Sequence, residues 1–203
     1  MGLRFSYTLL SPIYDLIVSS ATDPLRRTSL KQLKNVSGKH ILINGVGTGL
    51  DIPLLPPGAK YTATDLTPAM LNRAAGRIQK SSIDMTLLEA DSMALPFDNE
   101  SFDIIIMHLI LSVVPRPIDA LNEASRILKP GGEILILDKF LQPNQLAPIR
   151  RLINPVIKHI ATRTDVVFED LLNQADNLNL INNKPALLNG WFRYIQLTKT
   201  FAS

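Results

Sequence analysis

The chain has 203 residues, of which 46% are hydrophobic and 19% charged, and its formal net charge is +3. This composition excludes a disordered chain and provides enough apolar residues for one sizeable core. Because the sequence contains no cysteine, it excludes disulfides, thiolate metal sites and a cysteine nucleophile, and it fits a cytoplasmic protein.

The first two thirds of the sequence alternate between helical and extended patterns. Residues 12–36 are predicted to be helical, with Asp23 and Pro24 at a helix start, and Thr67 and Pro68 are predicted to begin a second helix. Further segments are predicted as strands at 40–44, 60–65, 84–90, 102–108 and 133–140 and as helices at 69–79 and 116–128. This alternation predicts a doubly wound parallel sheet with right-handed crossovers.

The last third has a different pattern. A proline-interrupted helical stretch (142–161) and a helix near 167–178 precede two strand-like segments, which flank Asn189 and Gly190. Asn-Gly between apolar strands is a strong hairpin signal. We therefore expect an α/β fold with a mostly parallel, doubly wound seven-stranded sheet and an antiparallel C-terminal hairpin. One domain is expected over 1–203, with a helical cap segment (1–38), a cofactor-binding core (39–140) and closing helices and hairpin (141–203).

Basic residues are concentrated in two parts of the sequence. Residues 144–164 contain four Lys or Arg and no acid, and the first forty residues also carry an excess of Lys and Arg. Two explanations remain open: solvated helix faces, or peripheral contact with an anionic inner-membrane surface, where each cation contributes about 1 kcal/mol. No aromatic residues interleave these cations, so no nucleic-acid partner is expected. No transmembrane segment or signal peptide is predicted.

A glycine-rich turn follows the first predicted strand. Gly45, Gly47 and Gly49 lie where ligands bind in such sheets, outside the carboxyl ends of the strands. Leu50 occupies the third glycine position of the dinucleotide fingerprint, which disfavours a nicotinamide oxidoreductase. Asp65 ends the second strand, where a carboxylate can accept both hydroxyls of a ribose; a helix cap is the structural alternative. Asp91 and Ser92 follow the third strand and are placed for an adenine edge.

These segments resemble a known family. "ILINGVGTGLDIPLLP", "YTATDLTPAML", "LEADSMALPFDNESFDIII" and "ILKPGGEILI" are similar to class I S-adenosylmethionine-dependent methyltransferases over about residues 40–140. Within that family, the motifs are most similar to bacterial phosphatidylethanolamine N-methyltransferases, with ubiquinone/menaquinone C-methyltransferases as the near alternative. The resemblance implies a Rossmann-like fold, S-adenosyl-L-methionine as cofactor, no metal, and a small or amphipathic methyl acceptor such as a lipid headgroup amine.

The resemblance also assigns residues to the site. It implies a cofactor-binding set of Gly45, Gly47, Thr48, Gly49, Asp65, Leu66, Asp91, Ser92, Met93 and His108. His108 is expected to border the methyl-transfer site as a base or an orienting group, the alternative being a packed histidine at a strand end. Tyr7 and Tyr14 are expected over the substrate, with Tyr14 also a catalytic candidate. Asp138 and Lys139 are candidates for substrate contact, the alternative being a solvated strand end.

The sequence departs from the family at one position. An acid that helps to hold the methionine amino end usually stands where this chain has Ile43. Its absence removes a charge-assisted hydrogen bond worth roughly 1.5–3 kcal/mol. Strand alternation points Asn44 to the other face, so it does not replace the acid. This departure also leaves open a non-catalytic protein that keeps the fold with weakened cofactor affinity.

Overall fold

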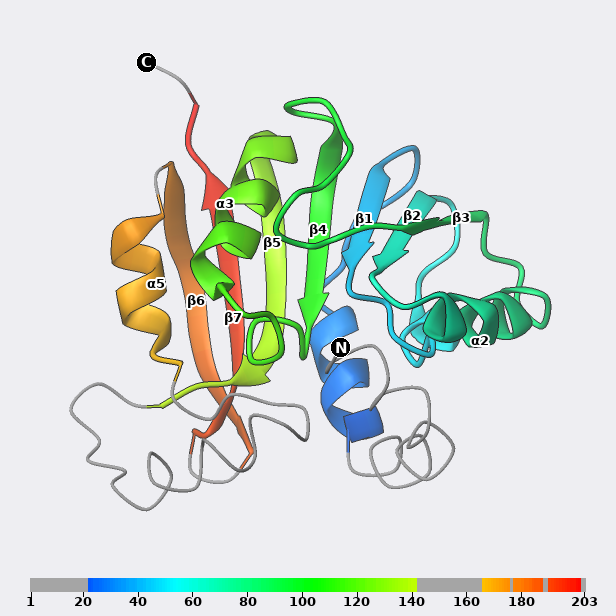
Figure 1. Cartoon of the computed structure of the whole chain (residues 1–203), viewed down its shortest axis with the longest axis horizontal. Coiled ribbons are helices and arrows are strands. Elements are labelled where there is room, and N and C mark those ends of the chain that lie inside the picture. The colour runs from blue at the N-terminus through cyan, green and yellow to red at the C-terminus, as the bar shows by residue number, and fades with distance from the viewer. Residues whose placement is uncertain (1–21, 142–165, 176, 188–189, 202–203) are drawn as a thin grey trace.

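Seven strands form one mixed sheet in a computed structural model that describes residues 22–141, 166–175, 177–187 and 190–201. The sheet order is β3-β2-β1-β4-β5-β7-β6 (Figure 1). The strands are β1 (His40–Asn44), β2 (Lys60–Asp65), β3 (Met85–Glu89), β4 (Phe102–His108), β5 (Leu128–Lys139), β6 (Leu178–Leu187) and β7 (Phe192–Lys199). Strands β1 to β5 pair in parallel, whereas β7 pairs antiparallel with both β5 and β6. The predicted fold is confirmed.

Helices cover both faces of this sheet (Figure 1). Helices α3 (Pro117–Ile127) and α5 (Phe168–Gln174) pack with the apolar side chains of one face. Helix α2 (Pro68–Ile78), the short 3-10 helix η1 (Ile52–Leu54) and the helical residues 22–30 contribute to the core on the other face. The sheet is therefore the middle layer of three.

Strand β4 shows why the central strands consist almost entirely of apolar residues. Ile105 and Met107 belong to the core on the α3 side, and Ile104 and Ile106 belong to the core on the α2 side. Because successive side chains point to opposite faces, a strand covered on both faces needs apolar residues at every position.

The chain order reverses beside β1. Strands β2 and β3 continue the sheet on one side of β1, whereas β4 and β5 continue it on the other. Ligands of doubly wound sheets bind at such a switch point, outside the carboxyl ends of the strands. The turn after β1 therefore occupies the expected position.

Some predicted boundaries differ from the structure. The first helix ends at residue 30 rather than 36, and the backbone then turns into β1 through Asn35 (φ 52°) and Gly38 (φ 75°). Strand β5 begins at Leu128 rather than 133, because a register shift against β4 absorbs residues 129–132 within the strand. The predicted helical stretch 142–161 lies outside the described residues. No helix in the described part of the chain is long and apolar enough to cross a membrane.

Candidate cofactor and active site

A cleft of about 340 Å³ opens at the carboxyl ends of β1, β2, β3 and β4. The residues of the predicted cofactor set that line it are Gly45, Gly47, Thr48, Asp65, Leu66, Asp91, Ser92, Met93 and His108. The structure thus brings together residues from four separate strand ends. Gly49 is the member of that set that does not line the cleft.

The glycine-rich turn presents its backbone to the cleft. The amides of Gly45 and Val46 both donate to the carbonyl of Thr64, at 3.0 and 2.8 Å, which ties the turn to β2. Gly47 has φ +54°, and a Cβ added there would meet nothing within 4 Å. Because Gly47 lines the cleft, this open space lets a ligand approach the main chain closely.

Gly49 has a packing role in this structure. Its φ is +84°, and an added Cβ would lie 2.6 Å from Cδ1 of Ile52 and 3.0 Å from Cα of Ala74. The glycine lets α2 pack directly against the turn. Its place in the sequence motif is therefore explained by close packing, since it does not reach the cleft.

Asp65 joins the glycine turn to the start of α2. Its Oδ2 accepts a hydrogen bond from the amide of Gly47 at 2.8 Å, and its Oδ1 accepts one from the amide of Thr67 at 2.9 Å. Burial raises the pKa of this carboxyl above its usual value, and the bonds from Thr67 and Gly47 oppose that shift. Each carboxylate oxygen has a further lone pair for a ribose hydroxyl. The predicted cap at Thr67 makes no side-chain bond to the helix.

The turn after β3 is built around Asp91. Its Oδ1 accepts the amide of Met93 at 2.9 Å, which fixes the turn. The Ser92 hydroxyl donates to Oδ1 of Asn44 at 2.7 Å and is therefore engaged away from a ligand. Asn44 is fully buried, and its Nδ2 has no hydrogen-bond partner among the described residues.

A buried polar network lies at the β1–β4 end of the cleft. Arg26 Nη1 lies 2.9 Å from Oδ2 of Asp51, and Oδ1 of Asp51 lies 3.0 Å from Nδ1 of His108. On its other side, Nε2 of His108 lies 2.9 Å from the hydroxyl oxygen of Ser29. Arg26 and His108 both line the cleft, although each of the four residues is less than a tenth exposed. We call Arg26, Ser29, Asp51 and His108 the polar network.

The charges of the polar network compensate one another. Burial alone would raise the pKa of Asp51, but Arg26 and His108 outweigh it and hold that pKa well below its usual value. Because the Asp51 carboxylate accepts at Nδ1, a neutral His108 carries its proton there and accepts the Ser29 hydroxyl at Nε2. Sequence analysis missed Arg26, Ser29 and Asp51, since no spacing rule connects a helix, a turn and a strand end.

Ile43 belongs to the hydrophobic core. It is 1% exposed and packs with Ile41, Val46 and Ile52 on the α2 side. Asn44 points to the opposite face, where it meets Ser92, as strand alternation predicts. Strand β1 therefore presents no carboxylate to the cleft, and the buried acid at this end is Asp51, on the turn that follows.

Asp138 and Lys139 do not line the cleft. Asp138 is fully buried and accepts the amides of Ser112 and Lys139, so its burial argues against the predicted contact with a substrate headgroup. Burial also raises the pKa of Asp138 and lowers that of Lys139. Tyr7 and Tyr14 lie outside the described residues, as does the basic stretch 144–164.

The basic N-terminal residues are partly neutralised. Arg26 is buried against Asp51, and Arg27 forms an exposed ion pair with Asp23 at 2.7 Å. These two cations are therefore poorly suited to bind an anionic membrane. Among the described residues of this part of the chain, Lys31, Lys34 and Lys39 remain as candidates for contact with an anionic membrane.

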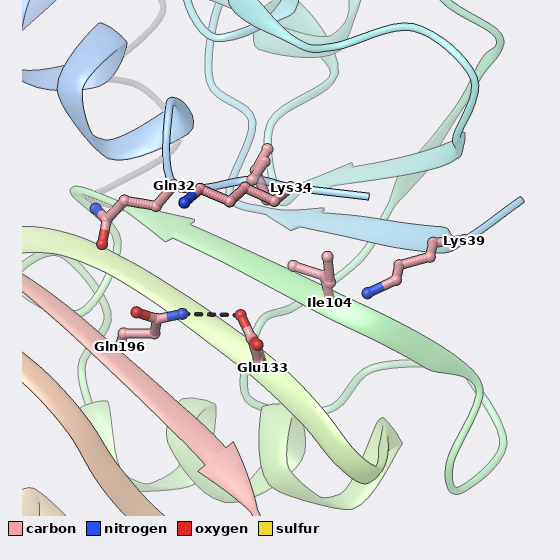
Figure 2. Close-up of a pocket in the computed structure, with 7 residues that line it drawn as sticks. Gln32, Lys34, Lys39, Ile104, Glu133 and Gln196 are labelled. Carbon is pink, nitrogen blue, oxygen red and sulfur yellow. Dashed lines mark hydrogen bonds between the residues drawn. The ribbon is translucent and has the colours of Figure 1, made fainter. Parts of the chain in front are cut away.

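A second hollow, of about 300 Å³, lies at the other end of the sheet (Figure 2). Lys34 and Lys39 line it together with Ile104 of β4, Glu133 in the middle of β5 and Gln196 of β7. The amide of Gln196 donates to Glu133 at 2.8 Å across two of these strands. Its lining shares no residue with the cleft at the carboxyl ends.

Comparison with known proteins agrees with this geometry. A family described as "Methyltransferase domain" matches residues 42–136, which include the glycine turn and strands β2 to β4. The chain is 26% identical over 190 residues to a phosphatidylethanolamine N-methyltransferase of Cereibacter sphaeroides, covering 92% of this chain and 93% of the relative. It is 33% identical over 157 residues to a demethylmenaquinone methyltransferase of Tropheryma whipplei, covering 74% of this chain but 64% of that relative.

The chain carries a methyltransferase domain, and these similarities support a class I S-adenosylmethionine-dependent methyltransferase. This family likeness supports S-adenosyl-L-methionine as the cofactor. Solved structures share the fold of the chain at low sequence identity. The [4+2]-cyclase SpnF has a TM-score of 0.79 at 16% identity and covers 98% of this chain and 95% of its own. A geranyl diphosphate methyltransferase in complex with SAM has a TM-score of 0.72 at 16% identity, covering 87% of this chain and 84% of its own.

Proposed function

We propose that this methyltransferase acts on an amphipathic acceptor and that the amine headgroup of phosphatidylethanolamine is the acceptor. The observation that carries the proposal is the similarity to a phosphatidylethanolamine N-methyltransferase along nearly the whole of both chains. The 109–115 segment after β4 supports it, because Ile110, Val113, Val114 and Pro115 make that side of the cleft apolar. An apolar wall suits the neighbourhood of an acyl chain better than that of a fully polar acceptor.

The described residues suggest how the cofactor is held. Asp65 would accept the ribose hydroxyls while it fixes Gly47 and Thr67. The turn at Asp91–Met93, with Leu66 opposite, would hold the adenine ring, and Leu66 is 41% exposed at the cleft. Since the Ser92 hydroxyl is bonded to Asn44, adenine would be recognised there by the main chain.

The cofactor supplies an activated methyl group on a sulfonium, so the protein mainly aligns the acceptor and excludes water. An alkyl amine with a pKa near that of lysine arrives protonated at neutral pH and must lose a proton before it can attack. His108 is the histidine that lines the cleft, and Asp51 orients it through Nδ1. We propose that Nε2 receives that proton once the acceptor displaces the Ser29 hydroxyl.

Two measurements test this function. Isothermal titration with S-adenosylmethionine and S-adenosylhomocysteine should show binding, and no binding at millimolar ligand would contradict the cofactor site. Incubation with labelled S-adenosylmethionine and vesicles containing phosphatidylethanolamine should give N-methylated lipid by mass spectrometry. His108→Gln should lower this turnover more than cofactor binding, whereas replacing the remote His40 should change neither.

A quinone precursor is the second candidate acceptor. The 33% identity to a demethylmenaquinone methyltransferase favours it, although the match covers only 64% of that relative. Demethylmenaquinone in the same vesicles distinguishes the two, because transfer to carbon leaves the lipid amine unmodified. Methylation of the quinone with none on phosphatidylethanolamine would favour this second candidate.

The peripheral membrane contact is a separate proposal. Lys31, Lys34 and Lys39 remain as its candidates among the described N-terminal residues. Co-sedimentation with anionic vesicles should decline with added salt, because surface charges are screened. Equal binding to neutral vesicles would contradict an electrostatic contact.

A further inference from the structure

The cleft has an asymmetric distribution of charge. Asp65 and Asp91 line it at the β2–β3 end. Arg26 lies at the opposite, β1–β4 end and is the one Lys or Arg among the cleft-lining residues that the structure describes. A ligand with a nucleoside at one end and an amino acid at the other presents one carboxylate. Electrostatics favours placing that carboxylate near Arg26 and away from the two acids.

Arg26 is held in place as a donor. Its Nη1 lies 2.9 Å from Asp51 and its Nε donates to the Thr22 hydroxyl at 3.2 Å. A guanidinium has five N–H donors, and these two contacts use two of them. Its planar shape allows it to bind a second carboxylate as well as Asp51. The side chain is 9% exposed, so its charge is poorly screened by water.

Asp51 is not free to take the part of the missing acid. Its Oδ2 faces Arg26 and its Oδ1 faces His108, and its side chain is 3% exposed. Ile43, the last apolar residue of β1 before Asn44, is buried among apolar side chains and offers no charge. This end of the cleft therefore presents the Arg26 guanidinium, which Asp51 holds in place. It presents no carboxylate that is free to bind a ligand.

We propose that Arg26 binds the carboxylate of the methionine part of the cofactor and that Asp51 positions Arg26 for this contact. The protein would then hold the methionine part of the cofactor by its carboxylate. An acid at position 43 would instead hold it by its amino group. The proposal rests on the cofactor site described under the proposed function. It also explains how the chain tolerates Ile43, because the lost bond to the amino group is replaced by one to the carboxylate.

Binding of truncated ligands to the wild-type protein tests the proposal without any substitution. S-adenosylhomocysteine carries both groups, S-adenosyl-4-thiobutyrate only the carboxylate, S-adenosyl-3-thiopropylamine only the amine, and 5′-methylthioadenosine neither. By isothermal titration, loss of the carboxylate should weaken binding at least tenfold, and loss of the amine should weaken it less than threefold. A larger effect of the amine than of the carboxylate would overturn the proposal.

Substitution of Arg26 separates binding from structure. Arg26→Met should weaken the two carboxylate-bearing ligands at least tenfold and leave the other two within about threefold. A purely structural arginine would weaken all four alike, and that result would overturn the proposal. Arg27→Met is the matched control, because Arg27 is on the same helix but exposed and paired with Asp23. If Arg26→Met fails to fold, Arg26→Lys should show a smaller loss confined to the same two ligands.

The two levels of failure are distinguishable. If the wild type binds none of the four nucleosides, the cofactor site itself is wrong. If it binds 5′-methylthioadenosine and S-adenosylhomocysteine equally, the site stands and the role of Arg26 is wrong.

Discussion

The two ends of the cleft are built in different ways. At the β2–β3 end, Asp65 and Asp91 each accept the amide two residues further along the chain and so fix the turn that follows their own strand. Asp65 also accepts the amide of Gly47 in the adjacent glycine turn. At the β1–β4 end, the polar network joins a helix, a turn and a strand that are far apart in sequence. Local turns make the first end recognisable from sequence, whereas the second end exists only after the chain has folded.

The largest expected effect concerns the stability of the β1–β4 end. Asp51→Asn leaves Arg26 buried without its carboxylate, and we expect a loss of about 3–5 kcal/mol in the free energy of unfolding at pH 7. Urea denaturation followed by circular dichroism measures this. Asp23→Asn is the control, because it breaks an exposed ion pair on the same helix and should cost less than about 1 kcal/mol.

The pH dependence of this loss follows from the depressed pKa of Asp51. A carboxyl with a folded-state pKa below its unfolded value of 3.8 stabilises the fold above pH 3.8, and that stabilisation disappears as pH falls toward the folded-state pKa. The difference between wild type and Asp51→Asn should therefore be full at neutral pH and shrink below about pH 3.8. A difference that stays constant down to pH 2 would show that charge is not its source.

The next effect concerns the β2–β3 end. Asp65→Ala removes the predicted ribose acceptor, and we expect S-adenosylhomocysteine to bind about 100-fold more weakly, from two charge-assisted hydrogen bonds. Isothermal titration measures it. Asp84→Ala, an exposed acid before β3, should leave affinity unchanged. Unchanged affinity in Asp65→Ala, with a native circular dichroism spectrum, would refute the ribose role.

Two glycines of one turn should respond differently. Gly49→Ala places a Cβ 3.0 Å from Cα of Ala74, so we expect a loss of stability of about 1–3 kcal/mol. Gly47→Ala meets no atom within 4 Å, and Gly47 lines the cleft, so the added methyl group should lower cofactor affinity more than stability. Thermal unfolding and ligand titration of both variants compare the two. Equal effects on affinity would mean that the turn acts as one unit.

The smallest expected effect tests whether the missing acid matters. If Arg26 anchors the carboxylate, Ile43→Glu should change the affinity for S-adenosylhomocysteine by less than about threefold in the folded fraction. Ile43→Val, which keeps the core apolar, is the matched control. A tenfold gain in affinity in Ile43→Glu would show that the site is simply weakened at this position.

Local signals account for what was predictable. The apolar run of β4, the glycines after β1 and the Asn-Gly between the last strands each indicate one element, and together they predict a doubly wound, mostly parallel sheet with a closing hairpin. Asp65, Asp91 and His108 were predictable because each stands at or directly after a strand end, and parallel strand ends meet at one edge. The end of the first helix at residue 30 and the start of β5 at Leu128 were not predictable, because backbone turns and a register shift decided them.

By itself, the sequence determined the fold, the position of the cleft and the acids at its β2–β3 end, because strand periodicity and turn chemistry act over a few residues. Only the tertiary structure decided which charges meet at the other end. Arg26, Asp51 and His108 are separated by 25 and 57 residues, and their pairing depends on how helix 22–30 packs over β1 and β4. Likewise, the close approach of α2 leaves no room for a side chain at Gly49. The glycine turn marks the site, and long-range packing sets its charge.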